Sequence, residues 1–183
     1  MNANEVIIPC RLSYANIWEP KQVNGTGDPK YSCCLLIRKS DTATIAKIKA
    51  AIEAVKKDPV SLAKWGGKLP PKLKDPLRDG DEEKDDENYA DCKFINANSS
   101  EKRRPRIIDQ RCNEVLDQDE VYSGCYANVK IGFFSYSASG NKGIGAGLEV
   151  IQKVRDGERL SGGNNLDGFE VLDEDPNDTD FLN

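Results

Sequence analysis

The side chains that could do chemistry are few, and their types argue against catalysis. The 183-residue sequence contains no histidine, so catalytic triads and histidine-based acid–base schemes are excluded. Its six cysteines are scattered without any Cys-x-x-Cys pair, whereas zinc sites usually show paired ligands at short spacing. We therefore interpret the cysteines as free and mostly buried, and we expect no metal, no cofactor and no enzymatic activity.

Two further motifs have the residue types of a metal site and of a dinucleotide-binding site but lack the sequence pattern around them. The acidic run that begins at Asp79-Gly80-Asp81 could hold a divalent ion for phosphodiester cleavage, but it lacks the D-x-D-x-D-G calcium pattern. We interpret residues 79–91 as a solvated loop. Residues 143–147, Gly-Ile-Gly-Ala-Gly, are not a dinucleotide fingerprint because no helix follows them.

Cationic and aromatic residues, in contrast, recur together along the chain. Proteins hold nucleic-acid single strands with cationic grooves that follow the phosphates and with aromatic faces that stack on bases. Each residue alone is more typical of a surface lysine or a core aromatic, and their repeated pairing is what indicates an interface. The candidate nucleic-acid-binding residues are Arg11, Tyr14, Trp18, Lys21, Lys30, Tyr31, Lys64, Trp65, Lys68, Lys72, Lys93, Phe94, Arg104, Tyr126, Lys130, Phe134, Tyr136 and Lys142.

The distribution of charge supports this interpretation although the formal net charge is −5. Residues 166–183 hold seven acids and no base, and residues 79–91 hold eight acids and one lysine. Without these two segments the chain has 25 basic and 16 acidic residues. The body is therefore basic, as expected of a protein that binds nucleic acid. No apolar run is long enough to span a membrane.

The C-terminal residues 164–183 are rich in glycine, asparagine and acids, and we expect them to be a disordered acidic tail. Phe181 lies near the end of this tail, with Asp178 and Asp180 before it. An aromatic residue in an acidic peptide offers a partner protein something to bind. A tail that only improves solubility is the alternative.

Periodicity predicts mainly strands and one clear helix. The helix is expected over residues 42–57, where Ile45, Ile48, Ile52 and Val55 form one apolar stripe that can cover a sheet. Residues 21–28 and 60–78 are expected to be loops. Strands are expected over residues 5–16, 31–37, 92–97, 106–109, 121–137 and 144–154.

The last two strands read as a hairpin with a two-residue turn at Gly140-Asn141. That turn predicts that Tyr136 faces Gly145 and that Phe134 faces Gly147. Period-2 alternation then separates a core face from an outer face. The core face has Val129, Ile131, Phe133, Ala146, Leu148 and Val150, and the outer face has Tyr126, Asn128, Lys130, Phe134 and Tyr136. The outer aromatics could be a stacking platform or could simply pack on the glycines opposite them.

These elements predict a mainly β fold with one covering helix: an OB-fold-like β-barrel over residues 1–163, followed by the disordered acidic C-terminal tail over residues 164–183.

Several segments also resemble a family of phage-encoded single-stranded DNA-binding proteins, over residues 5–163 and in the same order. The segments are residues 14–20 (Tyr-Ala-Asn-Ile-Trp-Glu-Pro), 30–32, 64–68 (Lys-Trp-Gly-Gly-Lys), 77–81, 94–98, 121–126, 140–144 and 151–157. The resemblance implies an OB-type fold, sequence-independent binding of single strands, and a role in phage DNA replication, recombination or repair. The tail resembles those of other single-strand binders but ends in Phe-Leu-Asn, not in phenylalanine.

We therefore expect a non-enzymatic, sequence-independent single-stranded DNA-binding protein that works in the cytoplasm of the infected bacterial host. The alternatives are a phage replisome adaptor that works mainly through protein–protein contacts, and a metal-dependent nuclease that uses residues 79–91. The expected partners are single-stranded DNA and, through the tail, phage or host replication and recombination proteins. No membrane partner is expected, and a homodimer remains open.

Overall fold

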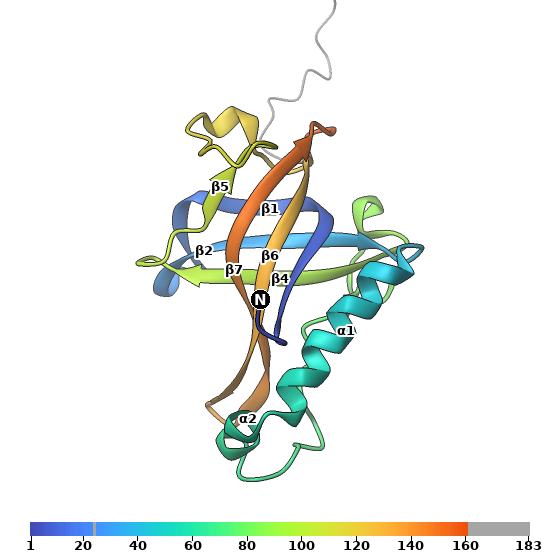
Figure 1. Ribbon diagram of the computed structural model, residues 1–183, viewed down its shortest axis with the longest axis vertical. Coiled ribbons are helices and arrows are strands. Elements are labelled where there is room, and N and C mark those ends of the chain that lie inside the picture. The colour runs from blue at the N-terminus through green and yellow to red at the C-terminus, as the bar shows by residue number, and fades with distance from the viewer. Residues whose placement is uncertain (24, 161–183) are drawn as a thin grey trace, which may run out of the picture.

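The computed structural model describes residues 1–23 and 25–160, and five long strands form its centre (Figure 1). Their order around the barrel is β1-β2-β4-β7-β6, and β6 pairs with β1 again. All neighbours are antiparallel except β4 and β7, which close the barrel in parallel at Ala97–Ala146 and Asn98–Gly147. This closed, five-stranded arrangement confirms the OB-type prediction. The strands are β1 (Glu5–Val23), β2 (Thr26–Arg38), β4 (Cys92–Ser100), β6 (Tyr126–Ala138) and β7 (Asn141–Arg155).

The remaining elements are one long helix and several short segments. They are α1 (Thr42–Lys57), α2 (Pro59–Lys64), β3 (Arg78–Asp79), α3 (Gly80–Glu83), the 3-10 helix η1 (Glu87–Tyr89), β5 (Arg106–Ile108) and the 3-10 helix η2 (Gln118–Glu120). No helix among the described residues is long and apolar enough to cross a membrane.

Helix α1 has the predicted bounds because its signals are local. The carboxylate of Asp41 accepts a hydrogen bond from the backbone of Thr44 at the N-terminus, and the apolar stripe is buried at Ile48, Ile52 and Val55. Asp58 ends α1 and also caps a second helix, α2, which begins at Pro59. The prediction of a loop from residue 60 is therefore wrong at its start, because one Asp-Pro pair both stops a helix and starts another.

The first hairpin is longer than predicted. Strand β1 continues to Val23, and the predicted loop over 21–28 is largely strand. The pairing of β1 with β2 is irregular between Ser13 and Asn16, and this irregularity interrupts the apolar alternation. The sequence pattern therefore predicts the end of the strand too early. Tyr14 lies in this irregularity with a φ of 45°.

The β6–β7 hairpin has a register two residues from the predicted one. Tyr136 faces Gly143 and Phe134 faces Gly145, because the turn residues with positive φ are Ser139 and Gly140. A shift of two residues keeps each side chain on its predicted face. Phe133 is fully buried, whereas Phe134 is 44% exposed.

Two details of this hairpin correct the sequence prediction. A bulge in the pairing of β6 with β7 places Val150 opposite Lys130, so Ile151 is buried in the core and Val150 is not. Strand β6 begins at Tyr126, since residues 121–125 form the turn that leads into it.

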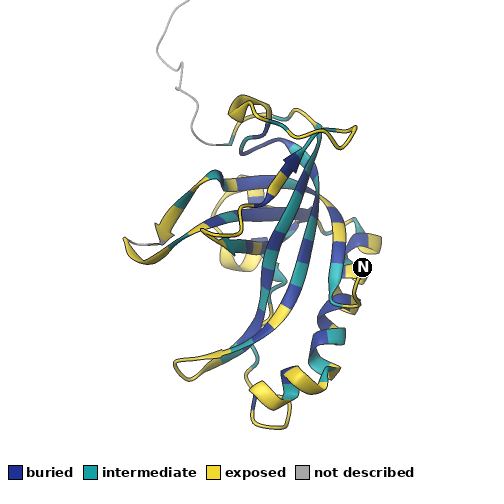
Figure 2. Cartoon of the chain, turned by 60° about the vertical axis from the view of Figure 1, so that its left-hand side comes forward, coloured by how far each residue is buried: buried dark blue, intermediate teal, exposed yellow. Residues whose placement is uncertain are grey.

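The core fills the barrel and extends under α1 (Figure 2). Buried and less buried residues alternate along β6 and β7, as the two faces of a strand require. A second, smaller apolar cluster lies on the outer side of β2 and β4 and is formed by Cys34, Leu36, Tyr89 and Phe94.

Residues 81–88 are all exposed, as the prediction of a solvated segment requires, but the segment contains α3 and η1 and is held against the barrel, so it is not a free loop. Lys39 Nζ lies 2.8 Å from Asp79 and 2.6 Å from Asp81, and Lys93 Nζ lies 3.3 Å from Asp79. Tyr89, in the same segment, is 1% exposed. The hydrogen bond from Lys39 lowers the pKa of the Asp79 carboxyl to about 2, so this acid is ionised under all physiological conditions.

Candidate nucleic-acid interface

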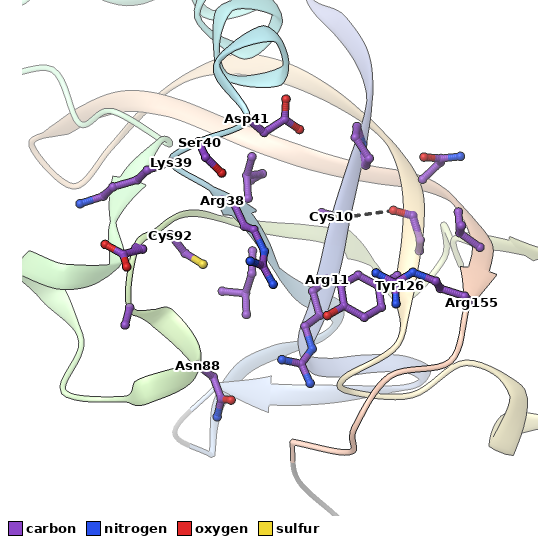
Figure 3. Close-up of a pocket in the computed structure, with 18 of the residues that line it drawn as sticks. Cys10, Arg11, Arg38, Lys39, Ser40, Asp41, Asn88, Cys92, Tyr126 and Arg155 are labelled. Atoms are coloured by element: carbon purple, nitrogen blue, oxygen red, sulfur yellow. Dashed lines mark hydrogen bonds between the residues drawn. The ribbon is translucent and has the colours of Figure 1, made fainter.

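A cavity of about 890 Å³ opens on the outer side of the barrel, bordered by β1, the end of β2, the segment before β4, and the ends of β6 and β7 (Figure 3). Three arginines from three different strands line it: Arg11, Arg38 and Arg155. Arg11 and Arg155 meet at Tyr126, the first residue of β6. We call this cavity the arginine cleft.

Tyr126 lies between two guanidinium groups (Figure 3). The Arg155 Cζ is 3.8 Å from the ring centroid and the Arg11 Cζ is 5.6 Å from it. Arg11 is fixed by donating hydrogen bonds to the carbonyl oxygens of Gly124, at 3.0 Å, and Glu158, at 2.8 Å. Stacking of this kind holds both cations and the ring at the wall of the cleft.

The cations of the cleft differ in whether a carboxylate of the protein already pairs with them. Lys39 is bound to Asp79 and Asp81. Arg38 and Arg155 are both exposed, and neither makes an ion pair with another described residue. Three carboxylates also border the cleft, from Asp41, Glu87 and Asp91. The two free guanidinium groups are therefore the ones available to an incoming anion.

The floor of the cleft is apolar and chemically inert. Leu36, Ala127 and the thiols of Cys10 and Cys92 line it. Burial raises the pKa of both cysteines, so the thiols stay protonated and are poor nucleophiles. A cavity with an apolar floor, an aromatic ring and guanidinium groups can hold bases and phosphates.

Tyr14 is the most exposed aromatic residue of the sheet. Its side chain is 60% exposed, and its backbone is in the left-handed region at a φ of 45°. The hydroxyl of Ser123 accepts a hydrogen bond from the backbone N–H of the next residue, Ala15. A tyrosine held outward in a strained conformation has a ring that is open to stacking.

The structure gathers a second group of predicted residues at the end of the β6–β7 hairpin. The indole N–H of Trp65 donates to the carbonyl of Tyr136 at 3.1 Å, and Lys142 Nζ donates to the carbonyl of Trp65 at 2.8 Å. Lys64 and Phe134 border one hollow on this hairpin. Lys68 and Lys72 follow α2 and are exposed.

Several predicted residues lie elsewhere. Tyr31, Trp65 and Phe94 are 8%, 2% and 0% exposed, so their rings belong to the core and offer no face to a base. Lys93 pairs with Asp79, and Lys130 lies 2.9 Å from Glu149 and 3.8 Å from Glu5. The last residues are spread over other surfaces: Arg104 lies over the half-buried Trp18, and Lys21 and Lys30 are exposed on the β1–β2 hairpin.

Sequence reasoning missed Arg38 and Arg155. Each is the last residue of a long strand, β2 and β7 respectively. That position is the only signal in the sequence, and it becomes informative once the barrel topology brings the two strand ends together. The proposed tail residues Asp178, Asp180 and Phe181 lie outside the described residues, as does the predicted tail itself. Within residues 1–23 and 25–160, no group of acidic or cysteine side chains is arranged to hold a metal ion.

Comparisons with known proteins point in the same direction as the cleft. A family model described as the single-stranded DNA-binding protein of Enterobacter phage Enc34 matches residues 4–182. The protein p50 of Acyrthosiphon pisum secondary endosymbiont phage 1 is 38% identical over 163 residues, which is 84% of each chain.

Two solved structures are also similar. The single-stranded DNA-binding protein of bacteriophage Enc34 in complex with single-stranded DNA is 28% identical, with a TM-score of 0.72 over 86% of this chain and 88% of that one. The single-stranded DNA-binding protein gp2.5 of bacteriophage T7 is 16% identical, with a TM-score of 0.60 over 95% of this chain and 100% of that one. The second match shows a shared fold only.

Proposed function

The chain belongs to the family of the Enterobacter phage Enc34 single-stranded DNA-binding protein, and from this we propose that it binds single-stranded DNA during phage DNA replication, recombination or repair. The binding is independent of sequence, since stacking and phosphate contacts do not distinguish bases. The protein coats single strands, protects them and transfers them to other proteins.

The observation that carries this proposal is the stack of Arg155, Tyr126 and Arg11 on the wall of the arginine cleft. The exposed guanidinium groups of Arg155 and Arg38 suit phosphates, because they present several N–H donors in a fixed plane. The apolar floor beneath them suits bases. Tyr14 adds an exposed ring on the same strand as Arg11.

We propose that this binding does not involve catalysis. The sequence offers no histidine, and the cysteine thiols on the cleft floor are protonated. Asp79 and Asp81, which a nuclease would use to hold a divalent ion, are bound to Lys39 in this structure.

The place of action and the protein partners follow from the same proposal. A phage replication protein works in the cytoplasm of the infected host, and we expect this of the present chain. We propose that the acidic tail, with Phe181 near its end, binds replication or recombination proteins of the phage or the host.

Fluorescence anisotropy with labelled oligonucleotides tests the proposal. Single strands of different sequence should bind with similar affinity and more tightly than a duplex of the same length. The logarithm of the affinity should fall linearly with the logarithm of the salt concentration, by about 0.7 for each phosphate contacted. Preference for duplex, or an affinity that salt does not change, would leave the replisome adaptor as the better explanation.

A further inference from the structure

The far end of the β6–β7 hairpin forms a basic lobe with the segment that follows α1 (Figure 1, bottom). We define the hairpin lobe as residues 59–74 together with residues 134–145. These 28 residues contain five lysines and no acid, in a protein whose formal net charge is −5. The lysines are Lys64, Lys68, Lys72, Lys74 and Lys142.

Hydrogen bonds hold the two parts of the lobe together. Besides the bonds of Trp65 to the hairpin, the backbone N–H of Lys74 donates to the carbonyl of Lys142, and the N–H of Ile144 donates to the carbonyl of Lys74, both at 3.2 Å. The segment therefore runs beside β7 as an additional short bridge. Backbone contacts therefore order the surface that carries these lysines, and Lys142 is itself bound to the carbonyl of Trp65.

Two aromatic rings of β6 lie over glycines of β7 in this lobe. A Cβ added at Gly145 would lie 2.6 Å from the ring of Phe134, and one added at Gly143 would lie 2.6 Å from the ring of Tyr136. The tip of each ring therefore rests against a strand glycine, and Tyr136 is half-buried. Phe134 is 44% exposed, and it borders a hollow of about 340 Å³ together with Lys64 and Val60.

None of the five lysines forms an ion pair with a described residue. Lys68, Lys72 and Lys74 are exposed. The lobe thus offers both features that hold a single strand, namely cations without an ion-pair partner for phosphates and the exposed ring of Phe134 for bases.

The lobe is separate from the arginine cleft. Tyr126 in the cleft and Tyr136 in the lobe are ten residues apart on the same face of β6, which corresponds to about 33 Å. Between them lies Lys130, which is bound by both Glu5 and Glu149. This ion-pair group has a net negative charge, so the phosphate backbone of a strand would not lie along it.

We propose that the hairpin lobe is a second single-strand contact site, which a long DNA strand reaches only after leaving the arginine cleft. This inference rests on the proposed function and adds the path of the strand to it. A strand that engages both sites must be long enough to go around the Lys130 group. Five nucleotides, which cover about 17 Å when stacked at 3.4 Å each, are too short to do so.

The test compares a five-nucleotide with a twenty-nucleotide strand in low salt, using the full-length protein. The double variant Lys68→Glu and Lys72→Glu should lose at least tenfold in affinity for the long strand. It should bind the short strand within twofold of the wild type. The matched control is Lys47→Glu with Lys49→Glu on the exposed side of α1, which makes the same charge change outside the lobe and should affect neither length by more than twofold.

Phe134 tests the stacking part of the proposal. Phe134→Ala should lose about fivefold or more on the long strand only, and Phe134→Tyr should restore the affinity to within twofold. Equal losses for both strand lengths, or losses as large in the α1 control as in the lobe variant, would overturn the second site while leaving the proposed function intact. Failure of the wild type to bind either strand would instead overturn the proposed function.

Discussion

The guanidinium group of Arg155, at the end of β7, stacks 3.8 Å from the ring centroid of Tyr126, at the start of β6. The two strands are paired along their length, so the barrel itself sets this contact. It places an exposed cation and an aromatic ring at the wall of the cleft before any ligand arrives.

Arg155→Ala should therefore weaken single-strand binding. Loss of one charge-assisted phosphate contact corresponds to about 1–2 kcal/mol, or roughly 5- to 30-fold in affinity. The salt slope should fall by about 0.7 at the same time. Arg159→Ala is the matched control, because Arg159 stacks on Tyr122 and does not line the cleft. Equal effects of the two variants would show that only total charge matters.

Substitutions at Tyr14 should separate stability from binding. Both Tyr14→Ala and Tyr14→Gly remove the exposed ring, and both should cost about 1–3 kcal/mol of binding. Only glycine also relieves the left-handed backbone at a φ of 45°, so Tyr14→Gly should be more stable than Tyr14→Ala by about 1–2 kcal/mol. Chemical denaturation and anisotropy measure the two effects. Unchanged DNA affinity in both variants would remove Tyr14 from the interface.

Gly124→Ala should destabilise the fold far more than Gly140→Ala. Both glycines have a positive φ, of 115° and 79°, so both variants carry backbone strain. A Cβ at Gly124 would lie 2.0 Å from the carbonyl oxygen of Glu158, whereas one at Gly140 meets nothing within 4 Å. The difference in the free energy of unfolding should be about 1–3 kcal/mol, measured in urea. Similar losses would show that residues 157–158 can move away freely.

The ion pair of Asp79 with Lys39 should make stability depend on acid pH. The pKa of Asp79 is lowered from an ordinary value near 4 to about 2. Its contribution is therefore present above pH 4 and is lost as the pH falls towards 2. Asp79→Asn should lower the melting temperature at pH 7, and the difference from the wild type should shrink by pH 2.5. A constant difference across this range would mean that the charge of Asp79 is irrelevant.

Deleting residues 166–183 should tighten DNA binding at low salt. These residues hold seven acids and no base, and a tethered anion competes at a high effective concentration for the same cations as DNA. The gain should shrink as salt rises, because the Debye length falls to about 10 Å at 0.1 M. Equal affinities of the full-length and truncated proteins at low salt would leave the segment with a solubilising or partner-binding role only.

The sequence predicts well those features that depend on residues close together in the chain. The cap at Asp41 and the stripe through Ile48 and Val55 are local, and the bounds of α1 follow from them. The faces of the last hairpin follow from alternation, which a two-residue shift does not disturb. The register itself depends on which residues take positive φ, and Ser139 does so here although serine seldom does.

The arginine cleft could not be predicted because its parts are distant in the chain. Arg38 and Arg155 end different strands, and only closure of the barrel brings them to one cavity. The burial of individual side chains could not be predicted either. Trp65 and Lys68 lie in the same basic, proline-rich segment, but Trp65 is only 2% exposed. Its indole N–H donates a hydrogen bond to the backbone carbonyl of Tyr136, which lies far away in the sequence.

The position of β1 in the barrel has a consequence for synthesis on the ribosome. One side of β1 pairs with the next strand in the sequence, but the other pairs Glu5 with Gly132 and Arg11 with Tyr126. At about 5–20 residues per second, that partner is made roughly 5–20 s after the first hairpin. During this interval Val6 and Ile8 lack their final neighbours, and an edge of β1 is open to other chains. Truncated nascent chains that end before β6 should therefore aggregate or depend on chaperones.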